Sequence, residues 1–97
     1  MIRVVNKRTH RGAAEYIGRP SPLGNPFVIG RDGDRDAVVA KYADWLARQA
    51  AEPGPVREAL VRLWRKAKAG EDIHLCCWCA PQRCHGDEVR AFLERYL

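Results

Sequence analysis

The sequence predicts a small single-domain α/β fold over residues 1–97, with at least two parallel strands in a sheet flanked by about three helices. Two short apolar runs, at 2–6 and 73–79, lie on either side of two segments with helical periodicity, and a third such segment follows the second run. This order of strands and helices is typical of an α/β domain. A chain of 97 residues, 46% of them hydrophobic, is long enough to form one packed core.

The N-terminal third is expected to begin as a strand and continue as an irregular segment. The run "IRVVN" (2–6) is apolar and contains β-branched residues, which favours a strand. From Lys7 to Gly33, five glycines and three prolines interrupt any helical period, although "EYI" (15–17) and "FVI" (27–29) could each form a short strand. The prolines of "RPSPLGNPF" restrict the backbone and predict a stiff loop.

Three segments have the periodicity of helices with one apolar face. The first, at 32–51, opens with acidic residues that suit a helix N-terminus; the second, at 56–70, follows the break "EPGP" and stops at a glycine; the third covers 84–97. Their inward faces are expected to carry Val38, Tyr42, Trp45, Leu46 and Gln49 in the first helix, Val56, Leu60, Leu63, Trp64 and Ala67 in the second, and Val89, Phe92, Leu93 and Tyr96 in the third.

The stretch "DIHLCCWCA" (72–80) predicts a strand that lies next to the first one and parallel to it. Side chains alternate along a strand, so Cys77 and Cys79 share one face while Cys76 and Trp78 share the other. In parallel sheets, ligands bind beyond the carboxyl ends of the strands. The segments "NKR" and "CAPQRCHGD", which come directly after the two strands, are therefore expected to meet at one site.

The charge of the chain suits an anionic partner. Lysines and arginines outnumber acidic residues by 17 to 12, for a net charge of +5, and 13 of the 17 are arginines. Arginine binds phosphate and carboxylate groups in a planar, bidentate way, so a nucleotide, a nucleic acid or a phosphorylated metabolite fits this composition. A solvated basic surface is the alternative.

The expected location is cytoplasmic, without a membrane partner. No apolar run approaches the roughly 20 residues that span a bilayer, and "MIRVVNKRTHRG" carries charge where a signal peptide would be apolar. The four cysteines lie within residues 76–84, which is not the spacing of a disulfide framework. Three interpretations of the cysteines remain: thiol chemistry, metal binding and simple packing.

The thiol interpretation centres on Cys84, the candidate nucleophile. At a helix N-terminus, beside Arg83 and His85, its pKa is expected to fall, whereas burial should raise the pKa values of Cys76 and Cys77. His85 is the candidate acid or base. Asp87 could serve as a second acid or base, or could cap the helix.

The metal interpretation takes Cys77, Cys79, Cys84 and His85 as a tetrahedral zinc site, although Cys-x-Cys is closer than the usual spacing of zinc ligands. The packing interpretation places the side chains of Cys76, Cys77 and Trp78 in the core, because free cysteine behaves as a small hydrophobe. For Cys79, packing and a pocket-lining role stay equally open.

The remaining candidates would bind the ligand: Asn6, Lys7, Arg19, Asn25 and Cys79. Asn6 and Lys7 end the first strand, and Arg19 and Asn25 stand on the stiff loop, which suits a preorganised site. Alternatively, the loop covers a sheet edge and Asn25 bonds its own backbone.

The stretches "VVNK", "YIGRPSPLGNPF", "KYADWL" and "CWCAPQRCHGD", in this order and spacing, resemble the domain-of-unknown-function 4326 family, small proteins of bacteria and their phages. The resemblance covers nearly the whole chain, and the two longer motifs are specific. It implies a compact α/β domain whose signature residues gather in one site. The family has no established reaction, so the resemblance assigns none.

The leading hypothesis is therefore a domain that binds a phosphate-bearing ligand, such as a nucleotide or a nucleic-acid component. Whether it also catalyses a reaction stays open. A non-catalytic module that binds or sequesters a nucleotide is one alternative. A zinc-stabilised nucleic-acid-binding protein is another, although its stacking residues would be tryptophans that fall in core-like positions.

Overall fold

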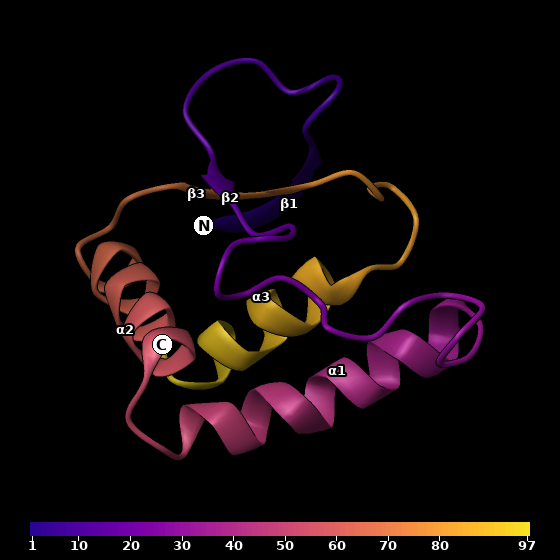
Figure 1. The fold of residues 1–97 in the computed structure, drawn as a ribbon. Coiled ribbons are helices and arrows are strands. Elements are labelled where there is room, and N and C mark those ends of the chain that lie inside the picture. The colour runs from indigo at the N-terminus through magenta and orange to yellow at the C-terminus, as the bar shows by residue number, and fades with distance from the viewer.

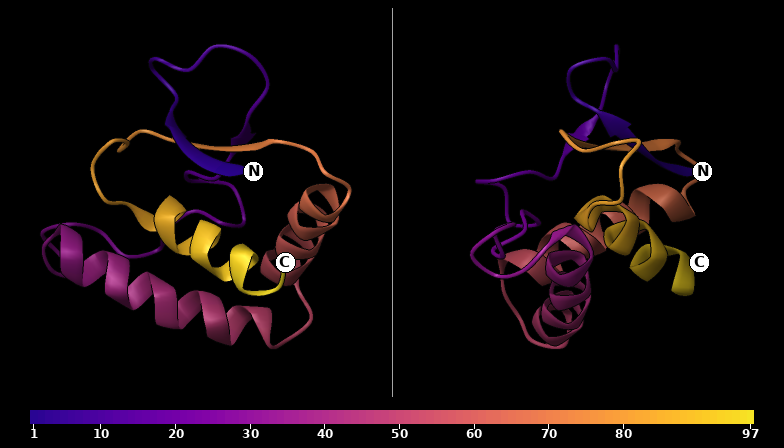
Figure 2. Two further views of the ribbon diagram at one scale, coloured as in Figure 1. Left: turned by 180° about the vertical axis from the view of Figure 1, so that it is seen from behind. Right: turned by 90° about the vertical axis from the view of Figure 1, so that its right-hand side faces the viewer.

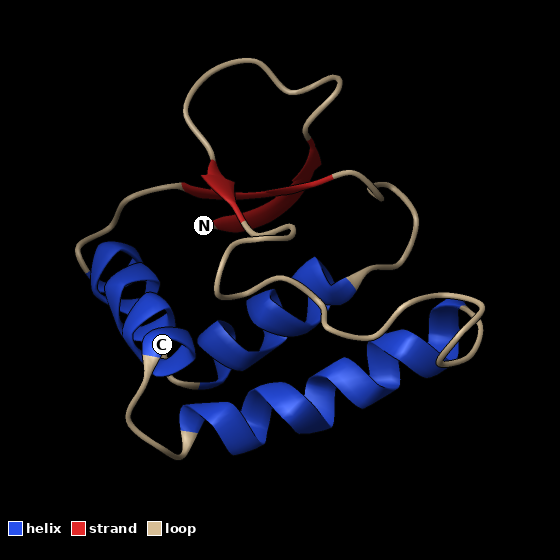
Figure 3. Ribbon diagram, in the orientation of Figure 1, coloured by secondary structure: helices blue, strands red, loops and turns tan.

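The computed structural model describes residues 1–97 and has three helices and three strands (Figures 1 and 3). The elements in chain order are β1 (Ile2–Asn6), β2 (Glu15–Tyr16), α1 (Arg35–Ala50), α2 (Pro55–Lys68), β3 (Ile73–Cys77) and α3 (His85–Arg95). The predicted α/β class is confirmed. No helix is sufficiently long and apolar to cross a bilayer.

The three strands form one parallel sheet in the order β1-β3-β2. Ile2 pairs with Ile73 and Asn6 pairs with Cys77, so β1 and β3 run side by side over their whole length and end at the same edge. The predicted parallel pairing of the two apolar runs is confirmed. β3 ends at Cys77, two residues earlier than predicted, and the next residues belong to a loop. Of the two optional strands, "EYI" contributes β2, while residues 27–29 form no strand.

All three helices lie on one side of the sheet, and the connection between β1 and β2 extends from the other side (Figures 1 and 2). The core lies between the sheet and the helices. Its members include Ile2, Ile17, Leu75 and, from the helices, Tyr42, Leu46, Leu60, Leu63, Val89 and Leu93. The predicted helix faces are thus confirmed in their central residues.

Two residues at helix ends were wrongly placed on the buried faces. Gln49 is exposed, and Tyr96 is 55% exposed and comes after the last residue of α3. Both lie in the final turn or just beyond it, where the helix has passed the edge of the core. Periodicity gives the direction of a side chain but not the point where the opposing element ends.

An ionic contact fastens the edge strand β2 to helix α2. The Glu15 carboxylate accepts hydrogen bonds from Arg62 Nη1 and Lys66 Nζ, each at 2.8 Å. The Lys66 ammonium, together with Arg62, lowers the pKa of the Glu15 carboxyl from its usual 4.5 against the opposing effect of burial. β2 has two residues, so this side-chain contact adds to the few backbone bonds that hold it.

Glu15→Gln is expected to lower the free energy of unfolding by about 1 kcal/mol at neutral pH, because a partly exposed ion pair contributes on that scale. The folded-state pKa is lowered, so the contribution is present above the unfolded pKa of about 4.5 and disappears as the pH falls through the folded value. Chemical denaturation should show a smaller difference from the wild type at pH 3 than at pH 7.

Glu52→Gln is the matched control, because Glu52 is exposed and forms no ion pair. An equal loss in both variants at pH 7 would mean that net charge, and not the contact of β2 with α2, accounts for the effect.

Candidate functional site

A cleft of about 460 Å³ opens at the carboxyl end of the sheet. Its walls come from three parts of the chain: the loop after β2, the N-terminal turns of α1, and the segment from the end of β3 to the start of α3. The loop after β2 and the cysteine segment therefore meet, whereas the segment "NKR" after β1, which was expected to share the site, does not line the cleft. This position is where parallel sheets of α/β proteins bind ligands.

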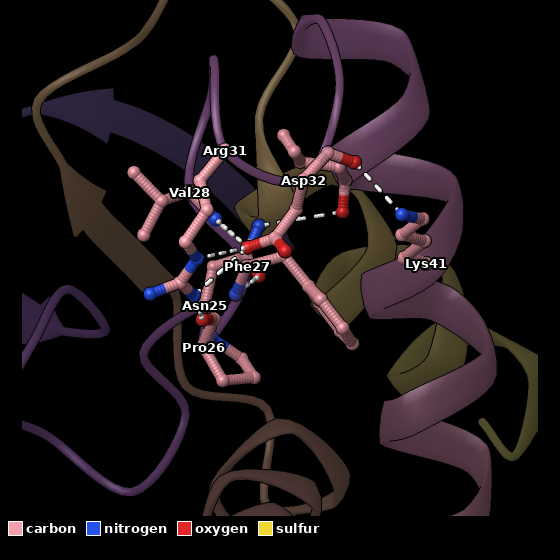
Figure 4. Close-up of polar contacts among 8 residues, drawn as sticks. Asn25, Pro26, Phe27, Val28, Arg31, Asp32 and Lys41 are labelled. Carbon is pink, nitrogen blue, oxygen red and sulfur yellow. Dashed lines mark hydrogen bonds and ion pairs between the residues drawn. The ribbon is translucent and has the colours of Figure 1, made fainter.

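The far part of the loop is fixed to itself and to α1 (Figure 4). Asn25 Oδ1 accepts the backbone N–H of Phe27 at 2.9 Å, and the Asp32 carboxylate accepts the backbone N–H of Val28 at 2.8 Å. Arg31 pairs with the same carboxylate and, together with that backbone N–H, lowers the pKa of Asp32. Lys41 of α1 donates to the Asp32 carbonyl at 2.8 Å. These hydrogen bonds shape the loop, and the oxygen of Asn25 takes part in them.

Two arginines line the cleft, and neither belongs to an ion pair. Arg19 is exposed, and its guanidinium has no hydrogen-bond partner within the protein. Arg35 donates from Nη1 to the carbonyl of Arg83 at 3.1 Å, which leaves its other donors free. The lining contains no aspartate or glutamate. The lining of the cleft therefore has two guanidinium groups and no carboxylate.

Trp78 and Tyr16 form an aromatic wall beside Arg19. Trp78 is 54% exposed, and its Nε1 donates to the hydroxyl of Tyr16 at 3.4 Å. The same hydroxyl donates to the Arg19 carbonyl at 3.0 Å. The expectation that Trp78 belongs to the core was wrong, because β3 ends one residue before it and the side chain emerges at the edge of the sheet.

Three cysteines converge at the floor of the cleft. The Sγ atoms of Cys77, Cys79 and Cys84 all lie within 4.8 Å of one another, and those of Cys77 and Cys84 are 3.1 Å apart. Cys77 and Cys84 are buried, while Cys79 is half-buried. Cys76 is buried on the opposite face of β3, and burial raises its pKa, as predicted.

The expected pKa values of the other two buried thiols are reversed. The hydrogen bond between the two Sγ atoms lowers the pKa of Cys77, and the backbone N–H groups of Cys79 and Ala80 lower it further against the effect of burial. The pKa of Cys84 is raised, first by the loss of that bond on ionisation and then by burial. The helix N-terminus does act on Cys84, through the N–H of Gly86 at 3.3 Å, but a single donor is outweighed.

His85 and Asp87 are both held by the backbone. His85 Nε2 lies 2.7 Å from the carbonyl of Ile17, so it carries a proton and donates, and the ring is buried with its edge against Tyr42. Asp87 Oδ2 accepts the backbone N–H of Cys84 at 3.0 Å, which is a capping interaction. Of the two roles considered for Asp87, the contacts in the structure are those of the cap.

Asn6 and Lys7 lie outside the lining of the cleft. Asn6 Nδ2 donates to the carbonyls of Trp78 and Ala80, at 3.0 and 2.8 Å, and so holds the loop after β3 against the end of β1. The Lys7 ammonium stands 5.2 Å from the centre of the Tyr16 ring. Asn6 therefore shapes the site from outside it, and Lys7 packs against its aromatic wall.

Sequence reasoning missed Arg35 and Tyr16 among the lining residues. Arg35 is the first residue of α1, where the helix dipole disfavours a positive charge. An arginine at this unfavourable position could have indicated a functional role, but it stands between Asp34 and Asp36, which suit a helix N-terminus. Tyr16 carried no comparable signal, because an aromatic residue in a strand is ordinary.

The family described as "Domain of unknown function (DUF4326)" matches residues 3–95. The chain belongs to this family, as the resemblance of its motifs indicated. No curated protein and no solved structure matches the chain.

In protein freed of metal and kept reduced, a limiting amount of iodoacetamide at pH 7 should label Cys79 first. Cys79 is the half-buried thiol of the cleft, while the other cysteines are buried. Cys76 and Cys84 should react more slowly, because both thiols are buried and both have raised pKa values. Peptide mass spectrometry of samples taken over time gives the order.

Cys79→Ser provides the control and should remove the fast-reacting fraction without changing the slow one. If Cys84 reacted first instead, its thiol would be more accessible and more acidic than its contacts indicate.

Proposed function

We propose that this DUF4326 protein binds a small phosphate-bearing ligand, a nucleotide or a nucleic-acid component, in the cleft at the carboxyl end of its sheet. The observation that supports this most directly is the pair of arginines, Arg19 and Arg35, in a lining without any carboxylate. Uncompensated guanidinium groups in a concave site favour an anion, and their planar donors match phosphate oxygens.

The position of the arginines favours a ligand that bridges them. Arg19 stands on the loop after β2, and Arg35 begins α1, so the two approach the cleft from different elements. Arg35 is partly anchored through its bond to the Arg83 carbonyl, which reduces the entropy lost when it binds a ligand. Arg19 is unanchored beyond its backbone. A phosphate group that contacts both would fasten the loop to α1.

The aromatic wall favours a ligand with a flat ring over free phosphate. Trp78 exposes 54% of its surface next to Tyr16, and the hydrogen bond between the two side chains fixes their relative position. Proteins that bind nucleobases without regard to base identity stack them on exposed aromatic side chains beside basic groups. Phe27 and Val28, in the loop after β2, add apolar surface to the lining.

The proposal concerns binding and not a reaction on the ligand. Cys84, the nucleophile considered from the sequence, is buried and has a raised pKa, and His85 is committed to the Ile17 carbonyl through Nε2. The contacts thus favour the non-catalytic form of the hypothesis, a module that binds or sequesters a nucleotide.

Arg19→Ala and Arg35→Ala should each weaken the binding of a nucleoside monophosphate by roughly 10- to 100-fold, the equivalent of about 1.5–3 kcal/mol for a lost charge-assisted contact. Neither should change the melting temperature by much, since neither side chain forms an ion pair. Isothermal titration calorimetry with a panel of nucleotides and inorganic phosphate provides the affinities.

Arg48→Ala is the matched control, because it removes the same charge from the last turn of α1, at the end away from Arg35. An equal loss in the control would indicate general electrostatic attraction. Absence of binding by the wild type across the whole panel would refute the proposal.

Trp78→Ala should weaken nucleotide binding by about 1–3 kcal/mol, the range for loss of one base-stacking contact, and should leave the weaker binding of inorganic phosphate unchanged. Comparing nucleotide with inorganic phosphate separates the contribution of the base from that of the phosphate group. Trp45→Phe is a suitable control, because Trp45 packs against the core and lies outside the lining of the cleft. Equal losses for nucleotide and phosphate would mean that Trp78 only supports the loop.

A further inference from the structure

We infer that Cys77, Cys79 and Cys84 bind one thiophilic divalent cation, zinc foremost, through three thiolates, with the fourth coordination position directed to the cleft. Zinc binding of this kind goes beyond the ligand binding proposed above and does not depend on it. The metal is a resident of the floor of the cleft, whereas the nucleotide would occupy the space above.

The sulfur positions fit a metal of this size. Tetrahedral zinc with Zn–S bonds of about 2.3 Å places its sulfurs roughly 3.8 Å apart. The separation of 3.1 Å between Cys77 and Cys84 lies below that value, and the limit of 4.8 Å for the whole set lies above it. Shifts of less than an ångström would therefore bring the three sulfurs into place.

The backbone holds two of the three ligands on rigid elements. Cys77 is the last residue of β3, and Cys84 is the N-cap of α3. Gly86 allows the first turn of α3 to lie close to β1, because a Cβ at this position would stand 3.0 Å from Val4 Cγ1 and 3.3 Å from Cys84 Sγ. Cys79 lies in the short loop between the two elements, where it can adjust to the ion.

The surroundings are suited to thiolates. Cys84 Sγ accepts the backbone N–H of Gly86 at 3.3 Å. Such donors around metal-bound sulfur disperse its negative charge and orient the ligand. Three thiolates with Zn²⁺ carry one net negative charge.

His85 does not complete the set, although the sequence suggested it as the fourth ligand. Its Nε2 is bonded to the Ile17 carbonyl, and the group of ligand atoms that lie close together contains the three sulfurs alone. Sites with three protein ligands characteristically keep the fourth position for water or a bound molecule. Because Cys79 and Cys84 both line the cleft, that position faces the space where a ligand would bind.

The test uses the whole chain, stripped of metal under reducing conditions, and zinc alone as the probe. Native mass spectrometry should show one zinc per chain. Competition with a chromophoric chelator should show that Cys79→Ser lowers zinc affinity by at least about 100-fold, since loss of a supporting group alone costs 10- to 100-fold. Cys76→Ser is the matched control and should retain wild-type affinity, because Cys76 lies outside the group.

Cobalt gives a second readout that does not depend on affinity. The thiolate-to-cobalt charge-transfer absorption should be that of three sulfurs in the wild type and should fall by about one third in Cys79→Ser, a change at a half-buried position that is expected to leave the fold intact. His85→Ala should leave it unchanged. Absence of zinc binding, or equal affinity in the wild type and Cys79→Ser, would overturn the inference. Loss of binding in His85→Ala, with the fold intact by circular dichroism, would overturn the three-thiolate set.

Discussion

The position of β3 in the middle of the sheet is the constraint on which the rest of the structure depends. β3 comes late in the chain but pairs in parallel with both β1 and β2, which come first. Parallel pairing requires a long connection, and here α1 and α2 provide it. The same pairing aligns all three strand ends at one edge, so the segments that come after them must meet there. The cleft and its thiols are a consequence of that alignment.

The segment between β3 and α3 is held by interactions with the backbone and not by a regular element. Asn6 binds two carbonyls of this loop, and Asp87 binds the N–H of Cys84 at the start of α3. Between these anchors the chain turns from the sheet back into the helical layer. Trp78 and Cys79 are consecutive in this loop and both line the cleft, Trp78 exposed and Cys79 half-buried. Asn6 and Asp87, which the sequence suggested as site residues, thus position the residues that line the cleft.

The charged residues in the cleft differ from those outside it in whether they form ion pairs. Glu15, Asp32 and Asp36 are each paired with an arginine away from the cleft lining, while Arg19 and Arg35 are not paired at all. The net charge of +5 is therefore less informative than its local arrangement. A positive cleft at the end of a parallel sheet, with an aromatic wall and a sulfur floor, combines three features that recognise different chemical groups.

The sequence by itself determined the α/β class, the three helices and the parallel pairing of 2–6 with 73–79. These depend on periodicity and on general rules of parallel sheets, which local residue patterns express. Only the tertiary structure decided that Trp78 is exposed, that the thiols of Cys77 and Cys84 lie in contact, and that Arg35 lines the cleft. Those outcomes depend on where an element ends and on which groups approach from distant parts of the chain. The spacing of residues along one segment indicates neither.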